Sequence, residues 1–258
     1  MTEEQAQRLR TQFCAGAADY VTSAGHAGDE DLDCLLAWGR RLRPRRVLDV
    51  ATGAGHTALA FAGLGAHITA FDLTEPMLSA ARGFLAERGA TDVRFVAGDV
   101  EALPFRAGAF DVVTCRIAAH HFVNVGLAVR QIAATIRPGG SLLVQDILGH
   151  DDGATAAFIT EVERRRDPTH VRAYRVVEWT ALLRGAGLTV MDETVFSKER
   201  RWEEWTARTR MTPEARAALE SLVRAAPSAR REAFHFRIDG DRIEAFTDRM
   251  ILLRADRD

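Results

Sequence analysis

A glycine-rich turn after an apolar run is the first feature of this sequence that suggests chemistry. Gly53 and Gly55 lie in the stretch 47–58, where the apolar run stops and a helix-forming segment follows. Glycines let the backbone adopt positive φ and let a ligand approach without a Cβ in the way. The N-terminus of the following helix offers unpaired N–H groups to an anion. The stretch therefore predicts a cradle for an anionic group of a ligand.

Three aspartates extend this cradle. Asp49 lies inside the same apolar run, where a carboxylate favours an ammonium group and repels a pyrophosphate. Asp72 ends a second run and could hold ribose hydroxyls, and Asp99 ends a third and could accept from an exocyclic amine such as that of adenine. A ligand with a carboxylate, an amine, a ribose and an adenine satisfies all of these groups.

The same residues allow two other interpretations. Residues 53–58 also satisfy the pattern G-x-G-x-x-G/A of dinucleotide-binding proteins, with Asp72 in the place of their ribose-binding acid. A nicotinamide or flavin oxidoreductase is thus an alternative, and a titration with NAD(P) would distinguish it. An ordinary strand-to-helix turn would need no ligand at all.

Alternating apolar runs and helical patterns indicate the elements that must position these residues. The spacing predicts strands at about 46–51, 67–72, 93–98, 110–116 and 141–147, and helices near 29–42, 56–64, 75–88 and 124–136. This order implies a mainly parallel, doubly wound sheet with right-handed crossovers. Ligands bind such sheets beyond the carboxyl ends of the strands, which is where the three aspartates fall.

The second half of the chain alternates less regularly. Its pattern predicts helices at about 154–165, 176–186, 201–208 and 213–225, strands at about 188–196 and 246–255, and a hairpin turn at 238–243. The arginine run 164–166 is typical of a solvated helix end.

Composition narrows the class of protein. The chain has 258 residues, of which 47% are hydrophobic and 27% charged. No apolar run approaches the roughly 18–20 residues of a membrane span, and the acidic start lacks the form of a signal peptide, so we expect a cytoplasmic protein without membrane insertion. A net charge of −2 gives no reason to expect nucleic-acid binding. Cys14, Cys34 and Cys115 form no CxxC pair, so neither a disulfide framework nor a metal site is predicted.

Five motifs in order resemble those of the class I S-adenosylmethionine-dependent methyltransferases, in the branch called methyltransferase type 11 or ubiquinone/menaquinone-biosynthesis-like. They lie at 47–58, 72–78, 98–105, 110–113 and 137–140. The resemblance covers about 45–150. It implies that the cofactor is S-adenosyl-L-methionine and that the acceptor is an O, C or N nucleophile of a small, aromatic or quinone-like molecule.

The resemblance also implies a role for individual residues. The backbone around Ala51, Gly53 and Gly55 would meet the methionine part of the cofactor, with Asp49 near its amine. Further contacts are implied for seven residues: Asp72 at the ribose, Leu73 and Met77 against the adenine, Asp99 and the Val100 N–H at the adenine edge, the Arg116 carbonyl near the amine, and Tyr20 in an N-terminal helix that covers the cofactor.

Two adjacent histidines could remove a proton from the acceptor. The methyl donor is already activated, so the protein has to align the reactants, exclude water and, for some acceptors, supply a base. His120 and His121 follow the fourth predicted strand, and we expect His121 to be the base. A capping or structural role is the alternative for both. A protein of this fold that binds the cofactor without methylating is a further alternative.

These observations predict one α/β domain over residues 1–258. We expect a Rossmann-like, doubly wound, mostly parallel seven-stranded sheet with helices on both faces. Residues 1–28 would form an N-terminal helical lid, 29–150 the cofactor-binding core, and 151–258 the cap helices and the last two strands. The expected partner is a small-molecule acceptor, and the oligomeric state stays open.

Overall fold

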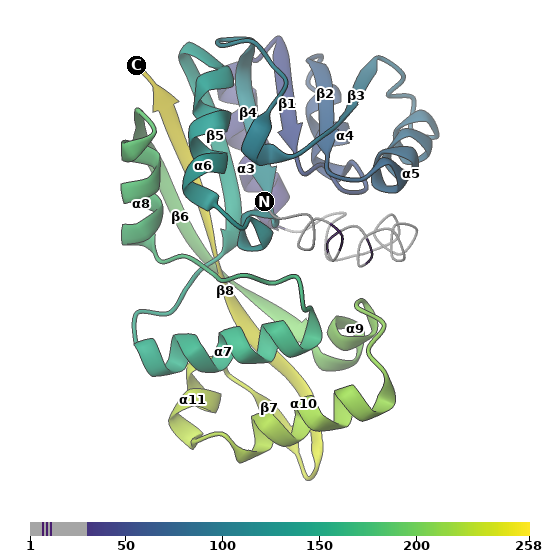
Figure 1. Cartoon of the computed structure of the whole chain (residues 1–258), viewed down its shortest axis with the longest axis vertical. Coiled ribbons are helices and arrows are strands. Elements are labelled where there is room, and N and C mark those ends of the chain that lie inside the picture. Colours follow the sequence, from purple (N-terminus) through teal and green to yellow (C-terminus); the bar gives the residue numbers. More distant parts are fainter. Residues whose placement is uncertain (1–6, 8, 10, 12–29) are drawn as a thin grey trace.

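The computed structural model describes residues 7, 9, 11 and 30–258, and these residues form an α/β fold around a mostly parallel sheet (Figure 1). The strand order is β3-β2-β1-β4-β5-β8-β6, and β7 pairs with β8. Neighbours among β1 to β5 are parallel, whereas β8 runs antiparallel to β5 and β6. The strands are β1 Arg46–Val50, β2 His67–Asp72, β3 Val93–Ala97, β4 Phe110–Arg116, β5 Ile136–Ile147, β6 Leu188–Arg201, β7 Arg237–Asp239 and β8 Arg242–Arg257.

Helices cover both faces of the sheet and give it two hydrophobic cores. Alternate side chains of a strand point to opposite faces, and in β1 Val47 joins one core while Leu48 and Val50 join the other. On the Val47 side lie α3 Glu30–Leu42, α4 His56–Ala62 and α5 Glu75–Ala86; on the Leu48 side lie α6 Val125–Thr135 and α8 Val176–Gly185. This arrangement explains why the parallel strands read as nearly continuous apolar runs.

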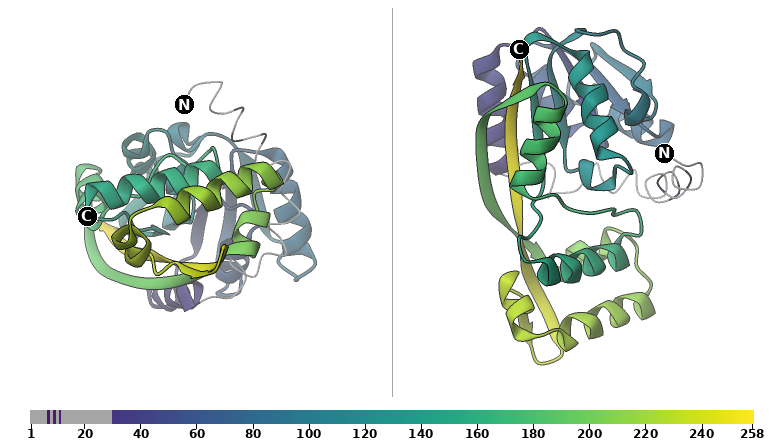
Figure 2. Two further views of the ribbon diagram at one scale, coloured as in Figure 1. Left: turned by 90° about the horizontal axis from the view of Figure 1, so that it is seen from below. Right: turned by 60° about the vertical axis from the view of Figure 1, so that its left-hand side comes forward.

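The last two long strands leave the core sheet and carry a second group of helices. Strands β6 and β8 stay paired from Leu188 opposite Arg257 to Arg201 opposite Ala245. Beyond the core sheet they meet α7 Gly153–Arg166, α9 Trp202–Ala207, α10 Pro213–Ala225 and α11 Ser228–Ala233 (Figures 1 and 2). We call these four helices, β7 and the adjoining ends of β6 and β8 the cap.

The cap has its own apolar core. Trp202, Trp205 and Phe246 lie at its centre, with side chains of α7 and α10 around them. The ring centroids of Trp205 and Phe246 are 4.8 Å apart in an edge-to-face arrangement, which is a favourable geometry for aromatic pairs. The cap is therefore a packed layer that holds its inner surface in a defined position.

Three features differ from the sequence prediction. The sheet has an eighth strand, because residues 237–239 pair with the start of β8 at the predicted hairpin turn. Strands β5, β6 and β8 are longer than predicted: β5 already begins at Ile136, and β6 extends further because Arg200 is buried against Asp248 instead of lying in a loop. The short helix α11 and two 3-10 turns, η1 Val100–Ala102 and η2 Ala119–His121, were not predicted.

None of the described helices combines the length and the apolar character that crossing a bilayer requires.

Candidate functional site

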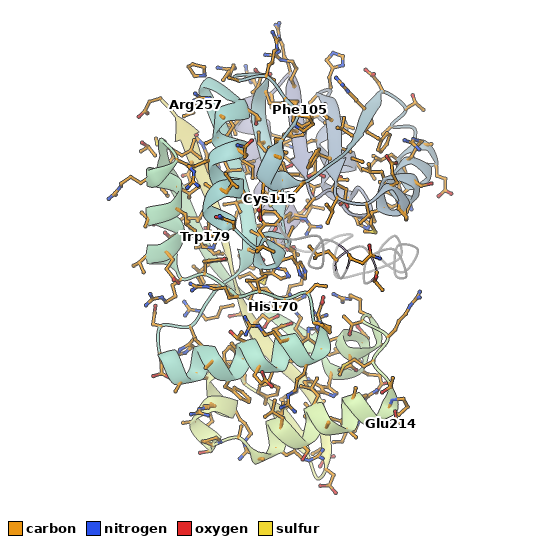
Figure 3. The ribbon with its side chains drawn as sticks, viewed as in Figure 1. Phe105, Cys115, His170, Trp179, Glu214 and Arg257 are labelled. Atoms are coloured by element: carbon orange, nitrogen blue, oxygen red, sulfur yellow. The ribbon has the colours of Figure 1, made fainter. Side chains whose placement is uncertain are left out.

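A cavity of about 180 Å³ lies at the carboxyl ends of β1 to β5, between the core sheet and the cap. Its upper wall comes from the segments that follow β1, β2, β3 and β4, and its lower wall from α7, α9 and the paired strands β6 and β8. Leu9 contributes to the wall from the N-terminal part of the chain. Figure 3 shows His170 in the layer between the sheet and the cap helices.

Left-handed backbone marks the turns that border the cavity. Ala51 and Gly53 have φ of 52° and 55° in the loop after β1, and Ile117 has φ of 53° in the loop after β4. Positive φ is a genuine outlier for a β-branched residue such as isoleucine. Strain of this kind concentrates at functional sites, where the surrounding structure enforces it.

Asp49 is a buried carboxylate at the centre of the upper wall. Its two oxygens accept hydrogen bonds from Thr52 Oγ1 at 2.6 Å and Thr114 Oγ1 at 2.7 Å. Burial raises the pKa of Asp49 to about 6, although the two hydroxyls and nearby Arg116 oppose the shift. A cationic group of a ligand would favour the ionised form.

Asp72 holds the glycine loop in place. Its Oδ2 accepts from the backbone N–H of Gly53 at 3.0 Å, and its Oδ1 accepts from that of Thr74 at 3.1 Å. Burial raises the pKa of Asp72 despite these bonds. The carboxylate thus ties the end of β2 to the loop after β1 while it also lines the cavity.

Asp99 closes the site on the β3 side. Its Oδ1 accepts from the backbone N–H of Glu101 at 2.9 Å and so caps the η1 turn that begins at Val100. Leu73, Met77 and Val100 line the same part of the cavity. The site therefore has apolar surface between the carboxylates of Asp72 and Asp99.

Gly55 lies outside the cavity wall. It has φ of 89° at the N-cap of α4, and a Cβ there would come within 3.1 Å of Leu85 Cδ1 and 3.3 Å of Ala81 Cβ. Packing of α4 against α5 requires this glycine. Tyr20 and the lid expected at 1–28 fall outside the described residues, apart from residues 7, 9 and 11.

Arg116 joins the site to α3 through a buried polar network. Its Nε donates to Thr57 Oγ1 at 3.0 Å, and its Nη1 lies 3.5 Å from Asp31 Oδ2. Gln145 also donates to Asp31, and Lys198 Nζ lies 3.6 Å from it. Sequence reasoning missed Asp31, since it lies in the first turn of a helix, where an acid is expected to be solvated.

His120 is a buried histidine held by Asp146. The two oxygens of Asp146 accept from His120 Nδ1 at 2.5 Å and from its backbone N–H at 2.9 Å. Burial is the largest single influence and lowers the pKa of His120, but the carboxylates of Asp146, Glu163 and Asp167 together raise it more, so the net shift is upward. This histidine therefore tends to keep its proton.

His121 has the opposite tendency. Burial and the charge of His120 lower the pKa of His121 to about 4. Its Nδ1 lies 3.1 Å from Thr169 Oγ1, and that hydroxyl donates to Asp167 Oδ1 at 2.5 Å. Because the Thr169 hydrogen is directed to Asp167, the Thr169 oxygen accepts from His121 Nδ1–H, which makes Nε2 the proton-accepting nitrogen.

A third histidine, His170, lies close to this pair. Its ring centroid is 5.2 Å from that of His120, and burial lowers its pKa. Although three histidines lie together, the described part of the chain holds no group of three or more His, Cys, Asp or Glu side chains placed to bind a metal ion.

The cap supplies a charged and aromatic lower wall that sequence reasoning did not predict. Glu163, Arg166 and Trp205 line the cavity, together with the buried pair Arg200 and Asp248. The Arg166 side chain is only 10% exposed. The interpretation of the run 164–166 as a solvated helix end is therefore wrong for Arg166, because the last turn of α7 packs against α9.

The chain is similar in sequence to known methyltransferases. Residues 48–144 match the family described as methyltransferase domain. The uncharacterized methyltransferase YcgJ of Bacillus subtilis is 35% identical over 198 residues, which cover 77% of this chain and 78% of that protein. The chain belongs to the class I S-adenosylmethionine-dependent methyltransferases.

A solved structure and a second sequence relative agree with this assignment. A candidate methyltransferase from Bacillus halodurans superimposes with a TM-score of 0.85 at 35% identity, over 88% of this chain and 99% of that one. The demethylmenaquinone methyltransferase of Thermus thermophilus is 37% identical over 128 residues, 46% of this chain and 58% of that protein. This methyltransferase therefore uses S-adenosylmethionine, and the oxidoreductase alternative is set aside.

Proposed function

We propose that this methyltransferase acts on an O, C or N nucleophile of a small aromatic or quinone-like molecule. One continuous cavity runs from the three aspartates to His120 and His121, and this observation carries the proposal. The similarity to a demethylmenaquinone methyltransferase supports the aromatic class of acceptor. A cytoplasmic location and the absence of nucleic-acid or membrane partners stay predictions.

The cofactor would lie against the upper wall. Backbone groups of Ala51 and Gly53 would meet its methionine part, with Asp49 beside its amine and the Arg116 carbonyl nearby. Asp72 would hold the ribose hydroxyls, Leu73 and Met77 would pack on the adenine, and Asp99 with the Val100 N–H would hold the adenine edge. The open cradle fits this group, since even a Cβ at Gly53 would meet only Met77 Cε, at 3.6 Å. Gly55 would act indirectly, by shaping the turn.

The division of labour along the chain follows the same geometry. We assign cofactor binding to residues 29–150 and acceptor binding to the inner surface of the cap, within one domain over 1–258. Leu9 in the cavity wall supports a covering role for residues 1–28.

Methyl transfer then needs little from the protein beyond alignment and a base. The bound cofactor supplies a methyl group that is already activated on sulfur. His121 accepts the acceptor proton at Nε2, since its low pKa keeps it neutral near pH 7. His120, paired with Asp146, keeps its proton and positions the turn that carries both rings. Such divergent pKa values in neighbouring groups are typical of acid and base assignments.

Cofactor binding is the first test. Calorimetry should give saturable binding of S-adenosylmethionine and of its demethylated product to the full chain, with release of demethylated product in the presence of the acceptor. Absence of binding of both compounds, at concentrations far above micromolar, would contradict the proposal. Tight binding without demethylated product would support a non-methylating protein instead.

A further inference from the structure

Glu163 is a buried charged residue of the cavity that the proposed chemistry does not use. Its side chain, on the inner face of α7, is 3% exposed and lines the cavity. Neither of its carboxylate oxygens has a hydrogen-bond donor among the described residues. Buried polar groups are nearly always hydrogen-bonded, and leaving one without a partner is costly. Such a group is expected where a ligand provides the partner.

Arg166 forms an ion pair with Glu163 but does not complete its hydrogen bonding. Its Nη2 lies 3.2 Å from Glu163 Oε2, which makes an ion pair but not a well-directed hydrogen bond. The Arg166 guanidinium lies over the Trp205 ring, 4.7 Å from its centroid, and Arg166 Nε has no acceptor among the described residues. The Trp205 ring thus holds the ion pair in position, and both Glu163 oxygens can still accept hydrogen bonds.

One buried water would not provide hydrogen bonds to both Glu163 oxygens. A small second cavity of about 10 Å³ lies behind Glu163, and His170, whose Nδ1 also has no partner among the described residues, lines it too. A space of that size holds about one water. If that water donates to His170 Nδ1, it has one hydrogen left for Glu163. At least one carboxylate oxygen then still needs a donor.

We propose that Glu163 recognises the acceptor by accepting a hydrogen bond from an O–H or N–H group on it. The inference rests on the proposed function and narrows its substrate class. The acceptor is a small aromatic molecule with a hydroxyl or ring N–H, and methylation of that donor group abolishes recognition. An ionised carboxylate can accept hydrogen bonds but cannot donate them. A compound that offers only ether or carbonyl oxygens would therefore place a second acceptor against the Glu163 oxygens and be repelled.

Burial supports the same role for Glu163. Desolvation raises its pKa, and Arg166 and His120 oppose the shift. A donor that replaces the lost water would stabilise the ionised carboxylate. The acceptor and the ionised form of Glu163 therefore favour each other.

The test compares two compounds that differ only in the donor group. Calorimetry first measures S-adenosylhomocysteine binding to the full chain, and failure of this step contradicts the proposed function alone. The saturated complex is then titrated with 1-naphthol and with 1-methoxynaphthalene. We expect the wild type to prefer 1-naphthol by at least about tenfold, the size of a charge-assisted hydrogen bond.

Variants of α7 assign the preference to Glu163. Glu163→Leu should reduce it to less than about threefold, and Glu163→Gln, which keeps an acceptor oxygen but no charge, should give an intermediate value. Glu161→Gln is the matched control, because Glu161 lies on the same helix, exposed and paired with Arg165. Equal binding of both compounds, no binding of 1-naphthol at millimolar concentration, or a preference that persists in Glu163→Leu would overturn the inference.

Thermal unfolding separates recognition from a structural role. If Glu163 serves the acceptor, Glu163→Gln, which keeps an oxygen beside Arg166, should melt within about 2 °C of the wild type, and both variants should bind S-adenosylhomocysteine with unchanged affinity. Glu163→Leu is expected to melt lower, since it removes one member of the buried ion pair with Arg166. If Glu163 is needed to fold the cap, Glu163→Gln should melt well below Glu161→Gln, and the inference would be wrong.

Discussion

At the residue scale, two buried groups of the cavity have pKa values shifted so far that the usual order of a carboxyl group and a histidine is reversed. Asp49 has a pKa raised to about 6, and His121 has a pKa lowered to about 4. Both shifts have desolvation as their largest cause, and burial always favours the neutral form. Ligand binding and turnover should therefore respond to pH at values that differ from those of solvated side chains.

Asp49 should couple cofactor binding to pH. The ionised carboxylate attracts the ligand ammonium group, so the affinity for S-adenosylmethionine should fall as the pH drops through about 6. Calorimetry in buffers of different ionisation enthalpy should detect proton release on binding near pH 6. In the free protein the sign is reversed: a raised carboxyl pKa contributes stability below the unfolded value of about 3.9, and this contribution is lost as the pH rises through about 6.

Substitution of Asp49 tests the same point. Asp49→Asn should weaken cofactor binding by at least about tenfold, since the charge that faces the amine is lost. Asp92→Asn is a suitable control, because Asp92 is 89% exposed. Equal affinities for the two variants would show that Asp49 does not contact the amine.

His121 should carry the base function. His121→Ala is expected to lower kcat by about 10²- to 10⁴-fold with the true acceptor, with little change in the KM for S-adenosylmethionine. Because His121 stays neutral down to about pH 4, the acid limb of the wild-type kcat, measured at saturating S-adenosylmethionine, should not have the midpoint near 6.5 of a solvated histidine. Unchanged turnover in His121→Ala would remove this role.

The sequence predicted the upper wall of the cavity better than the lower one. Asp49, Asp72 and Asp99 lie in or just after the carboxyl ends of neighbouring parallel strands, and these ends meet at one edge of the sheet, so their convergence follows from the local pattern. Glu163 and Trp205 depend on which face of α7 and α9 is buried. The helix α7 has little apolar periodicity, and a charged residue at its core position resembles a solvated one. Their role could only be recognised from tertiary packing.

At the element scale, a single buried carboxylate anchors helix α3 to the sheet. Asp31 in its first turn contacts Arg116 on β4, Gln145 on β5 and Lys198 on β6. Removing one member of a buried ion pair leaves an uncompensated charge. The helix, the strand that borders the cofactor cradle and the edge strand are thus joined by one carboxylate.

Asp31→Ala should destabilise the protein by about 3 kcal/mol, measured as the free energy of unfolding in urea. Asp33→Ala, an exposed position on the same helix, should change it by less than about 0.5 kcal/mol. Equal losses for the two variants would mean that helix propensity, and not the buried network, governs the effect.

Element boundaries were predictable where local signals are strong. Thr74 and Asn124 cap α5 and α6 with side-chain hydrogen bonds, and both helices begin within one residue of the predicted start. The extension of β6 was not predictable, because residues 198–201 are all charged. Arg200 is buried only because Asp248 on β8 lies 2.7 Å away, and a partner so distant in sequence leaves no local signal.

At the scale of the whole molecule, the methyltransferase consists of a core that resembles those of its relatives and a cap built on two strands of the same sheet. The match to the family covers 48–144, whereas the residues that we assign to acceptor recognition lie on α7. In the function that we propose, cofactor and acceptor would therefore meet between parts of the chain that are far apart in sequence. The packed aromatic core of the cap holds the helices that carry these residues together.

The long ladder between β6 and β8 also limits how the enzyme can be re-engineered. A shorter enzyme could not be made by deleting the cap at two linkers, because the cut would sever paired strands and expose the edge of β8, which invites aggregation. A graft from a relative would have to place its junctions at turns, such as the one at Gly240. Exchange of single side chains on α7 and α9 is the route that leaves the hydrogen-bonded sheet intact.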